Sequence, residues 1–154
     1  LNSKGGNETQ DSFGYNSYKK TFNHIKVEYS FIFKNLKLYY KKENFIITHS
    51  GLNPKKYNNP LNDLTISDVI FNRFDFINLR RFYKRKYTII FGHTAFYSPF
   101  YDGYKIGVDT GACYEKEQPL SSFCLESKEF IDSNKKEYTL SSINKNRSPI
   151  IIMK

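Results

Sequence analysis

The 154 residues are enough for one domain, and the 14 phenylalanines and 13 tyrosines can form a core although only 39% of the chain is hydrophobic. The formal charge of +9 suits a nucleic acid, an anionic surface or a phosphorylated substrate and does not choose among them. No apolar run is long enough to cross a membrane, and Cys113 and Cys124 lack the spacing of a zinc site, so we expect a soluble, cytoplasmic protein with reduced, buried thiols.

The first part of the chain predicts helices followed by one buried strand. Residues 1–17 are rich in Gly, Asn and Ser, which is typical of a loop with a short helix start. Aromatic and aliphatic residues then recur every three or four positions over residues 17–40 and predict one or two amphipathic helices. The apolar run 45–49 ends at Ser50-Gly51, as a buried strand entering a tight turn does. Two prolines and four asparagines make 53–64 a surface loop.

The second part predicts two helices and several strands. Helical segments are expected at 65–73 and 76–83, and the second leads into a basic run at 80–86 that is typical of a solvated helix face. The predicted strands are 87–91 and 105–109, and the segments 120–125 and 137–142 are expected to form a further strand pair. The polar tail after residue 142 is not assigned an element.

Histidines follow two of these strands in the same manner. His49 stands at the end of the first strand, immediately before Ser50-Gly51, and His93 follows Phe91-Gly92, while Asp109 closes the next run. Ligands in open α/β sheets lie at the carboxyl ends of strands, and imidazole and carboxylate groups bind divalent metals. The pattern favours a shared metal site, with purely structural histidines as the alternative. The third histidine, His24, lies in an amphipathic stretch and is expected on a helix surface.

Five short motifs resemble those of the serine/threonine phosphoprotein phosphatases, which belong to the calcineurin-like metallophosphoesterases. They follow the family's order over about residues 5–126. The matching segments are Gly5-Gly-Asn-Glu-Thr9 with Ser12-Phe-Gly14, Phe45-Ile-Ile-Thr-His49-Ser-Gly-Leu-Asn-Pro54, Ile70-Phe-Asn-Arg73, Phe91-Gly-His-Thr94 and Ile106-Gly-Val-Asp-Thr-Gly-Ala112. The resemblance implies an α/β fold, the second half of a two-sheet metallophosphoesterase sandwich flanked by helices. Residues 1–126 would be the C-terminal part of the catalytic domain, and 127–154 its terminal strand and tail.

The resemblance also implies roles for individual residues. His49 and His93 would bind one of two divalent metal ions, which are Mn, Fe or Zn in such enzymes, and Arg73 would hold the substrate phosphate. Asp109 would support the ligand loops as an outer carboxylate or as part of a structural Asp-Thr-Gly turn. The implied activity is hydrolysis of phosphomonoesters, in particular phosphoserine and phosphothreonine in proteins. Hydrolysis of symmetrical dinucleoside polyphosphates is the alternative within the same superfamily.

The family's earlier motifs, GDxH, GDxVDRG and GNHE, do not occur in this sequence. They carry the remaining metal ligands and the catalytic histidine, so we expect at most one partial metal site here and little phosphatase activity from this chain alone. Because Leu1 opens the chain within a family motif, a truncated or split gene is the expected explanation. A basic nucleic-acid-binding module and a non-catalytic regulatory fragment are the alternatives from other functional classes.

Overall fold

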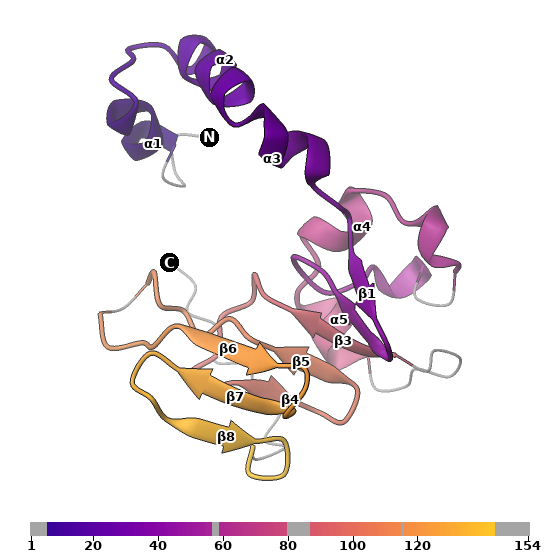
Figure 1. Cartoon of the computed structure of the whole chain (residues 1–154). Helices are drawn as coiled ribbons and strands as arrows, with labels where there is room; N and C mark the ends of the chain where they lie inside the picture. Colours follow the sequence, from indigo (N-terminus) through magenta and orange to yellow (C-terminus); the bar gives the residue numbers. More distant parts are fainter. Residues whose placement is uncertain (1–5, 57–58, 80–86, 115, 144–154) are drawn as a thin grey trace. The chain divides into compact units, whose positions relative to one another are not determined.

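The computed structural model describes residues 6–56, 59–79, 87–114 and 116–143. The chain divides into two compact units, Leu1–Lys37 and Leu38–Lys154 (Figure 1). The first unit contains helices, and the second contains two β-sheets together with short helices. The division at residue 126 expected from the sequence falls in a turn within the second unit.

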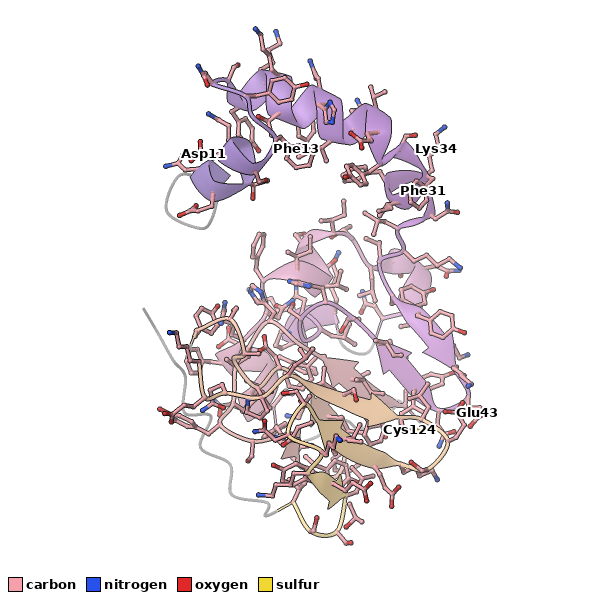
Figure 2. The ribbon with its side chains drawn as sticks, turned by 60° about the vertical axis from the view of Figure 1, so that its left-hand side comes forward. Asp11, Phe13, Phe31, Lys34, Glu43 and Cys124 are labelled. Carbon is pink, nitrogen blue, oxygen red and sulfur yellow. The ribbon has the colours of Figure 1, made fainter. Side chains whose placement is uncertain are left out.

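The helices of the first unit are α1 (Gly6–Ser12), α2 (Tyr18–Glu28) and α3 (Ser30–Asn35). The predicted amphipathic segment is therefore two helices, which separate at Tyr29, where φ is −102° and ψ is 24°. Helix α1 is attached to α2 by aromatic contacts. The ring of Phe13, labelled in Figure 2, lies 5.4 Å from His24 and 6.3 Å from Tyr29, centroid to centroid.

The larger sheet of the second unit is mixed. Its strands, in spatial order, are β1 (Tyr40–Lys42), β2 (Phe45–Ile47), β3 (Thr88–Phe91), β5 (Lys105–Gly107) and β4 (Phe100–Tyr101). The central three, β2, β3 and β5, run parallel, while β1 and β4 are antiparallel edge strands. The three parallel strands coincide with the apolar runs that the sequence predicts. The short edge strands were not predicted, because two or three residues carry too little periodicity.

The second sheet is an antiparallel meander of β6 (Ser121–Cys124), β7 (Glu129–Asp132) and β8 (Glu137–Thr139). The predicted strands near 120–125 and 137–142 are confirmed by β6 and β8, but their predicted pairing is wrong, because each pairs with β7 and not with the other. Strand β7 between them was not predicted, although it is the central strand and pairs with both neighbours (Figure 1).

The pleat of the larger sheet divides its side chains between two cores. Phe45, Ile90 and Ile106 face one side and pack in a single cluster with Phe130 of the second sheet. The opposite face belongs to a second cluster, formed by Ile46, Ile89, Phe91, Leu52, Leu64, Val69, Phe76, Ile77, Phe96 and Phe100. Successive strand residues point to opposite faces, so one sheet can bury apolar side chains on both. The structure is thus a mixed α/β arrangement with a helical layer and a second sheet on the larger sheet's two faces.

Two short helices follow the loop after β2, α4 (Ser67–Ile70) and α5 (Phe74–Asn78), and the loop itself contains the 3₁₀ turns Pro54–Lys56 and Leu61–Asp63. The helical prediction is confirmed in type, but the boundaries differ. The second helix begins earlier and ends at Asn78, and the basic run 80–86 lies outside the described residues. Its predicted solvated face therefore stays a prediction.

The prediction that both cysteines are buried is wrong. Cys113 and Cys124 are free thiols, as predicted, but both are exposed instead of buried (Figure 2 labels Cys124). Cys124 is the last residue of β6, which is an edge strand of the second sheet. None of the described helices is long and apolar enough to span a membrane.

Candidate metal centre

The three parallel strands bring His49, His93 and Asp109 to one edge of the larger sheet. Each of these residues lies two positions beyond the last residue of its strand, β2, β3 or β5. The strands are neighbours in parallel register, with Ile47 opposite Ile90 and Phe91 opposite Gly107. Their carboxyl ends therefore meet, as the sequence predicts from the turns that follow each run.

The two histidines contact each other directly. Nε2 of His49 lies 3.2 Å from Nδ1 of His93, and the ring centroids are 4.9 Å apart. A backbone hydrogen bond of 3.0 Å from the amide of Gly92 to the carbonyl oxygen of His49 fixes the two turns to one another. Two residues that are 44 positions apart in sequence are thus held together by the sheet and by this bond.

His93 adopts an unusual backbone conformation. Four described non-glycine residues have positive φ, and three of them, Glu43, Lys128 and Lys135, occupy turns between antiparallel strands. The fourth is His93, with φ of 65°, at the end of a parallel strand. A left-handed non-glycine residue costs about 1–2 kcal/mol, and such strain concentrates at functional sites. This conformation is an independent reason to assign a function to His93.

Gly92 follows the middle of the three parallel strands and lies between the turns that follow the other two. A Cβ atom at this position would lie 3.5 Å from the carbonyl oxygen of His49 and 3.9 Å from Cβ of Asp109. Those are ordinary contact distances, so the turn carrying His93 passes directly between the other two strand ends. His49, His93 and Asp109, three of the four predicted site residues, therefore lie in neighbouring turns at one edge of the sheet.

The distance between the two nitrogens is compatible with a hydrogen bond and also with one shared metal ion. Two nitrogens 3.2 Å apart, each about 2.1 Å from one ion, subtend about 100° at it, between the octahedral and tetrahedral angles. His49 is exposed and His93 is half-buried, so an ion can reach them. Two imidazoles are only part of a coordination sphere. Within the described ranges, no group of three or more His, Cys, Asp or Glu residues is arranged to hold a metal.

Asp109 organises the turn that follows β5. Its Oδ1 accepts a 2.9 Å hydrogen bond from the amide of Gly111, and its carbonyl oxygen accepts one of 2.9 Å from the amide of Phe96. The first bond closes the Asp-Thr-Gly turn, and the second ties the segment after His93 to it. Of the two roles expected for Asp109, these bonds correspond to the turn-forming one.

Arg73 is positioned by a network around the turn that follows His49. The hydroxyl of Ser50 donates to the carbonyl of Val69 at 2.8 Å and accepts a 3.1 Å bond from the amide of Asn72. The side-chain amide of Asn72 also donates to the carbonyl of Gly51 at 3.1 Å. Arg73 follows at the start of α5 and is half-buried. Among the described residues, none makes a hydrogen bond or ion pair with its guanidinium, which leaves that group able to bind an anion.

Gly51 explains why α5 can approach this turn. A Cβ atom at Gly51 would lie 1.9 Å from Cδ1 of Phe76, a fully buried residue of α5. No larger residue fits this site without displacing the ring. The glycine of the His-Ser-Gly motif is therefore required for packing between the turn and the helix.

Two residues next to the histidines were not singled out by the sequence. The ring of Phe71 meets His93 edge to face, with 6.1 Å between centroids, although the side chain is 73% exposed. Thr94 is fully buried, and its hydroxyl has no hydrogen-bond partner within the part of the chain that the structure describes. Phe71 belongs to the Ile-Phe-Asn-Arg motif, two positions before Arg73. This proximity in the sequence was the only signal that it would lie near the site.

His24 belongs to the first unit, whereas His49 and His93 belong to the second. It lies on α2, as predicted, but is half-buried and contacts both the hydroxyl of Tyr15, at 3.1 Å, and the carboxylate of Glu28. These three residues line a shallow pocket of about 480 Å³ together with Lys20, Asn23 and Val27. The contacts of His24 with Tyr15 and Glu28 are those of a structural histidine in the helical unit.

Comparison of the chain with protein-family models and with curated proteins finds no match. The resemblance to the phosphoprotein phosphatases therefore depends on the five ordered motifs, and the fold brings four of them together at or next to the histidine pair.

Proposed function

We propose that this chain contributes to a metal-dependent phosphatase site that hydrolyses phosphomonoesters. The observation that carries the proposal is the contact between His49 and His93, 3.2 Å apart at the carboxyl edge of the parallel strands. Phosphoserine and phosphothreonine in proteins are the substrates that the resemblance implies. The positive charge of +9 is compatible with a phosphorylated substrate.

Each residue has a defined task in this proposal. His49 and His93 would hold one divalent cation, which when bound would polarise a phosphoryl oxygen and acidify a water molecule. The guanidinium of Arg73 would donate paired hydrogen bonds to the other phosphoryl oxygens and so orient the phosphorus for in-line attack. Asp109 would keep the turn after β5 in place beneath the histidines through its bond to Gly111.

Two imidazoles cannot support this chemistry alone, because a phosphatase of this type needs carboxylate ligands and a second metal position. We therefore propose that a further segment carrying these ligands completes the site. Catalysis would then require both parts, and the present chain alone would bind metal weakly and turn over slowly.

Metal titration tests the proposal on the chain itself. We expect Mn²⁺ and Zn²⁺ to bind to the wild-type chain and to lose most of that binding in His49→Ala and in His93→Ala, measured by isothermal titration calorimetry. Zinc is included because imidazole is a good ligand for it. His24→Ala is the matched control and should bind metal normally, because its ring belongs to the other unit. Unchanged binding in the His49 and His93 variants would eliminate the proposed site.

The substrate is tested separately in a protein that combines this chain with a segment carrying the GDxH, GDxVDRG and GNHE motifs. Release of inorganic phosphate from a phosphoserine peptide, with no ADP from diadenosine tetraphosphate, is the expected result. The opposite pattern would replace the phosphatase by a dinucleoside-polyphosphate hydrolase.

A further inference from the structure

Ser50 carries a buried hydroxyl next to an exposed candidate metal ligand. Its side chain is fully buried, whereas the preceding residue, His49, is exposed. The amide and the hydroxyl of Ser50 both donate to the carbonyl oxygen of Val69, each at 2.8 Å. The same hydroxyl accepts a 3.1 Å hydrogen bond from the amide of Asn72. The turn that follows β2 is therefore fastened to α4 and to the residue that precedes Arg73.

Asn72 depends on this hydroxyl for its backbone position. Helix α4 ends at Ile70, so the amide of Asn72 lies beyond the helix and donates to the side chain of Ser50. The side-chain amide of Asn72 donates to the carbonyl oxygens of Gly51 and Asp68, at 3.1 and 2.8 Å. A backbone amide that loses its acceptor away from water costs free energy, so the chain shifts to find another partner. Without the Ser50 hydroxyl, we therefore expect the backbone at Asn72 to move.

The backbone of Arg73 is held from its other side by α5. Its carbonyl oxygen accepts a 3.0 Å hydrogen bond from the amide of Ile77. In the same helix, Phe76 packs so closely against Gly51 that a Cβ atom there would lie 1.9 Å from Cδ1 of the ring. Arg73 is thus tied to the turn after β2 through Ser50 before it and through Gly51 after it. A long side chain that starts from a fixed backbone loses less freedom when it binds a phosphate.

We propose that Ser50 is a positioning residue that sets the place of Arg73 relative to His49. The inference deepens the proposed function and rests on it, because Arg73 is taken to hold the phosphate of phosphoserine. Ser50 acts through its hydrogen bond to the amide of Asn72 and contacts neither the metal nor the phosphate. A small displacement of a group that orients the substrate greatly reduces its effect. Loss of the hydroxyl should therefore weaken phosphate binding and leave metal binding unchanged.

Two affinities of the full chain test this role. The dissociation constant of Mn²⁺ and, at saturating Mn²⁺, that of phosphoserine are measured by isothermal titration calorimetry for the wild type and for Ser50→Ala. We expect the substitution to raise the phosphoserine constant by about threefold to tenfold, the value of one hydrogen bond. The Mn²⁺ constant should stay the same, because His49 and His93 remain held by the sheet and by the bond from Gly92.

Ser50→Cys separates hydrogen bonding from packing. Cysteine fills a similar space, but its sulfur is a weak donor and a weak acceptor, so this variant should lose phosphoserine affinity as Ser50→Ala does. It also takes the place of Ser50→Ala if thermal unfolding shows that the alanine variant does not fold. Thr21→Val is the control for loss of a buried hydroxyl, because Thr21 donates to the carbonyl of Ser17 within the helical unit. It should leave both constants unchanged.

Several results would overturn the inference. They are an unchanged phosphoserine constant in Ser50→Ala, wild-type affinity in Ser50→Cys, and no binding of phosphoserine to the wild type. Equal weakening of Mn²⁺ and phosphoserine in Ser50→Ala would also reject it, because the hydroxyl would then support the fold in general and not Arg73. Failure of the proposed function is distinguished by the metal titration of His49→Ala and His93→Ala, which uses no phosphoserine and does not involve Ser50.

Discussion

Asp68 is a buried carboxylate whose partners hold the loop after His49 against α4. Its side chain is 3% exposed and accepts hydrogen bonds from the amide and hydroxyl of Thr65, from the side chain of Asn53 and from Nζ of Lys56. The Thr65 hydroxyl and amide, together with Asn53, hold the pKa of Asp68 well below its ordinary value. The network joins Asn53, in the motif that contains His49, to Asp68 of α4.

This network predicts a pH dependence of stability. A depressed folded-state pKa means that Asp68 contributes stability at pH values above its unfolded pKa of about 3.9, and that the contribution is lost as pH falls toward the folded pKa. Asp68→Asn should therefore unfold at lower urea concentration than the wild type at pH 7. The difference in stability between the two proteins should shrink as pH is lowered below about 4. Protonation of Asp68 then removes from the wild type the stabilising interactions of the carboxylate, which the asparagine variant lacks at every pH. A stability difference between wild type and variant that stays constant as pH is lowered would contradict the depressed pKa of Asp68.

Lys105 joins two elements, β5 and α5. Its side chain is fully buried, and Nζ donates to the carbonyl oxygens of Phe76 at 3.1 Å, Ile77 at 2.6 Å and Leu79 at 2.9 Å. The ammonium group also pairs with Asp102 at 2.9 Å. The last carbonyl groups of a helix lack partners within the helix and favour a cation. The ammonium group of Lys105 provides hydrogen-bond donors and a positive charge at this end of α5, and so fixes the helix to the sheet.

Removal of this lysine should be costly. Lys105→Met removes the ion-pair partner of Asp102 and the ammonium donor to the carbonyl groups of Ile77 and Leu79, so we expect a loss of about 3–5 kcal/mol in the free energy of unfolding, measured by urea denaturation. Lys42 is the control, because it pairs with Glu126 at an exposed position, 40% and 70% open to solvent. Lys42→Met should leave stability almost unchanged. Equal effects of the two substitutions would mean that burial of Lys105 has no consequence.

At the scale of the molecule, the site and both apolar clusters lie within the second unit. His49, His93, Asp109 and Phe71 all fall between residues 38 and 154, as do all residues of the two clusters. The first unit has its own contacts, such as those of Phe13. All described residues that form the candidate metal centre and the two apolar clusters therefore belong to the second unit.

This organisation predicts that residues 38–154 alone retain the metal site. A polypeptide of this length should fold cooperatively and bind Zn²⁺ with the affinity of the whole chain, because no described ligand or cluster residue is removed. Circular dichroism and calorimetry provide the two measurements. Loss of zinc binding in a polypeptide that still unfolds cooperatively would show that the helical unit takes part in the site.

The sequence alone determined the parts of this protein that depend on local pattern. Apolar runs ended by glycine predicted the three parallel strands, and the position of His49, His93 and Asp109 after these runs predicted that they share one edge of the sheet. Tertiary structure decided what depends on contacts between distant residues: the 3.2 Å approach of His49 to His93, the exposed ring of Phe71 beside them and the burial of Lys105. Strand order, register and long-range hydrogen bonds fix these, and local periodicity carries no information about partners many residues away.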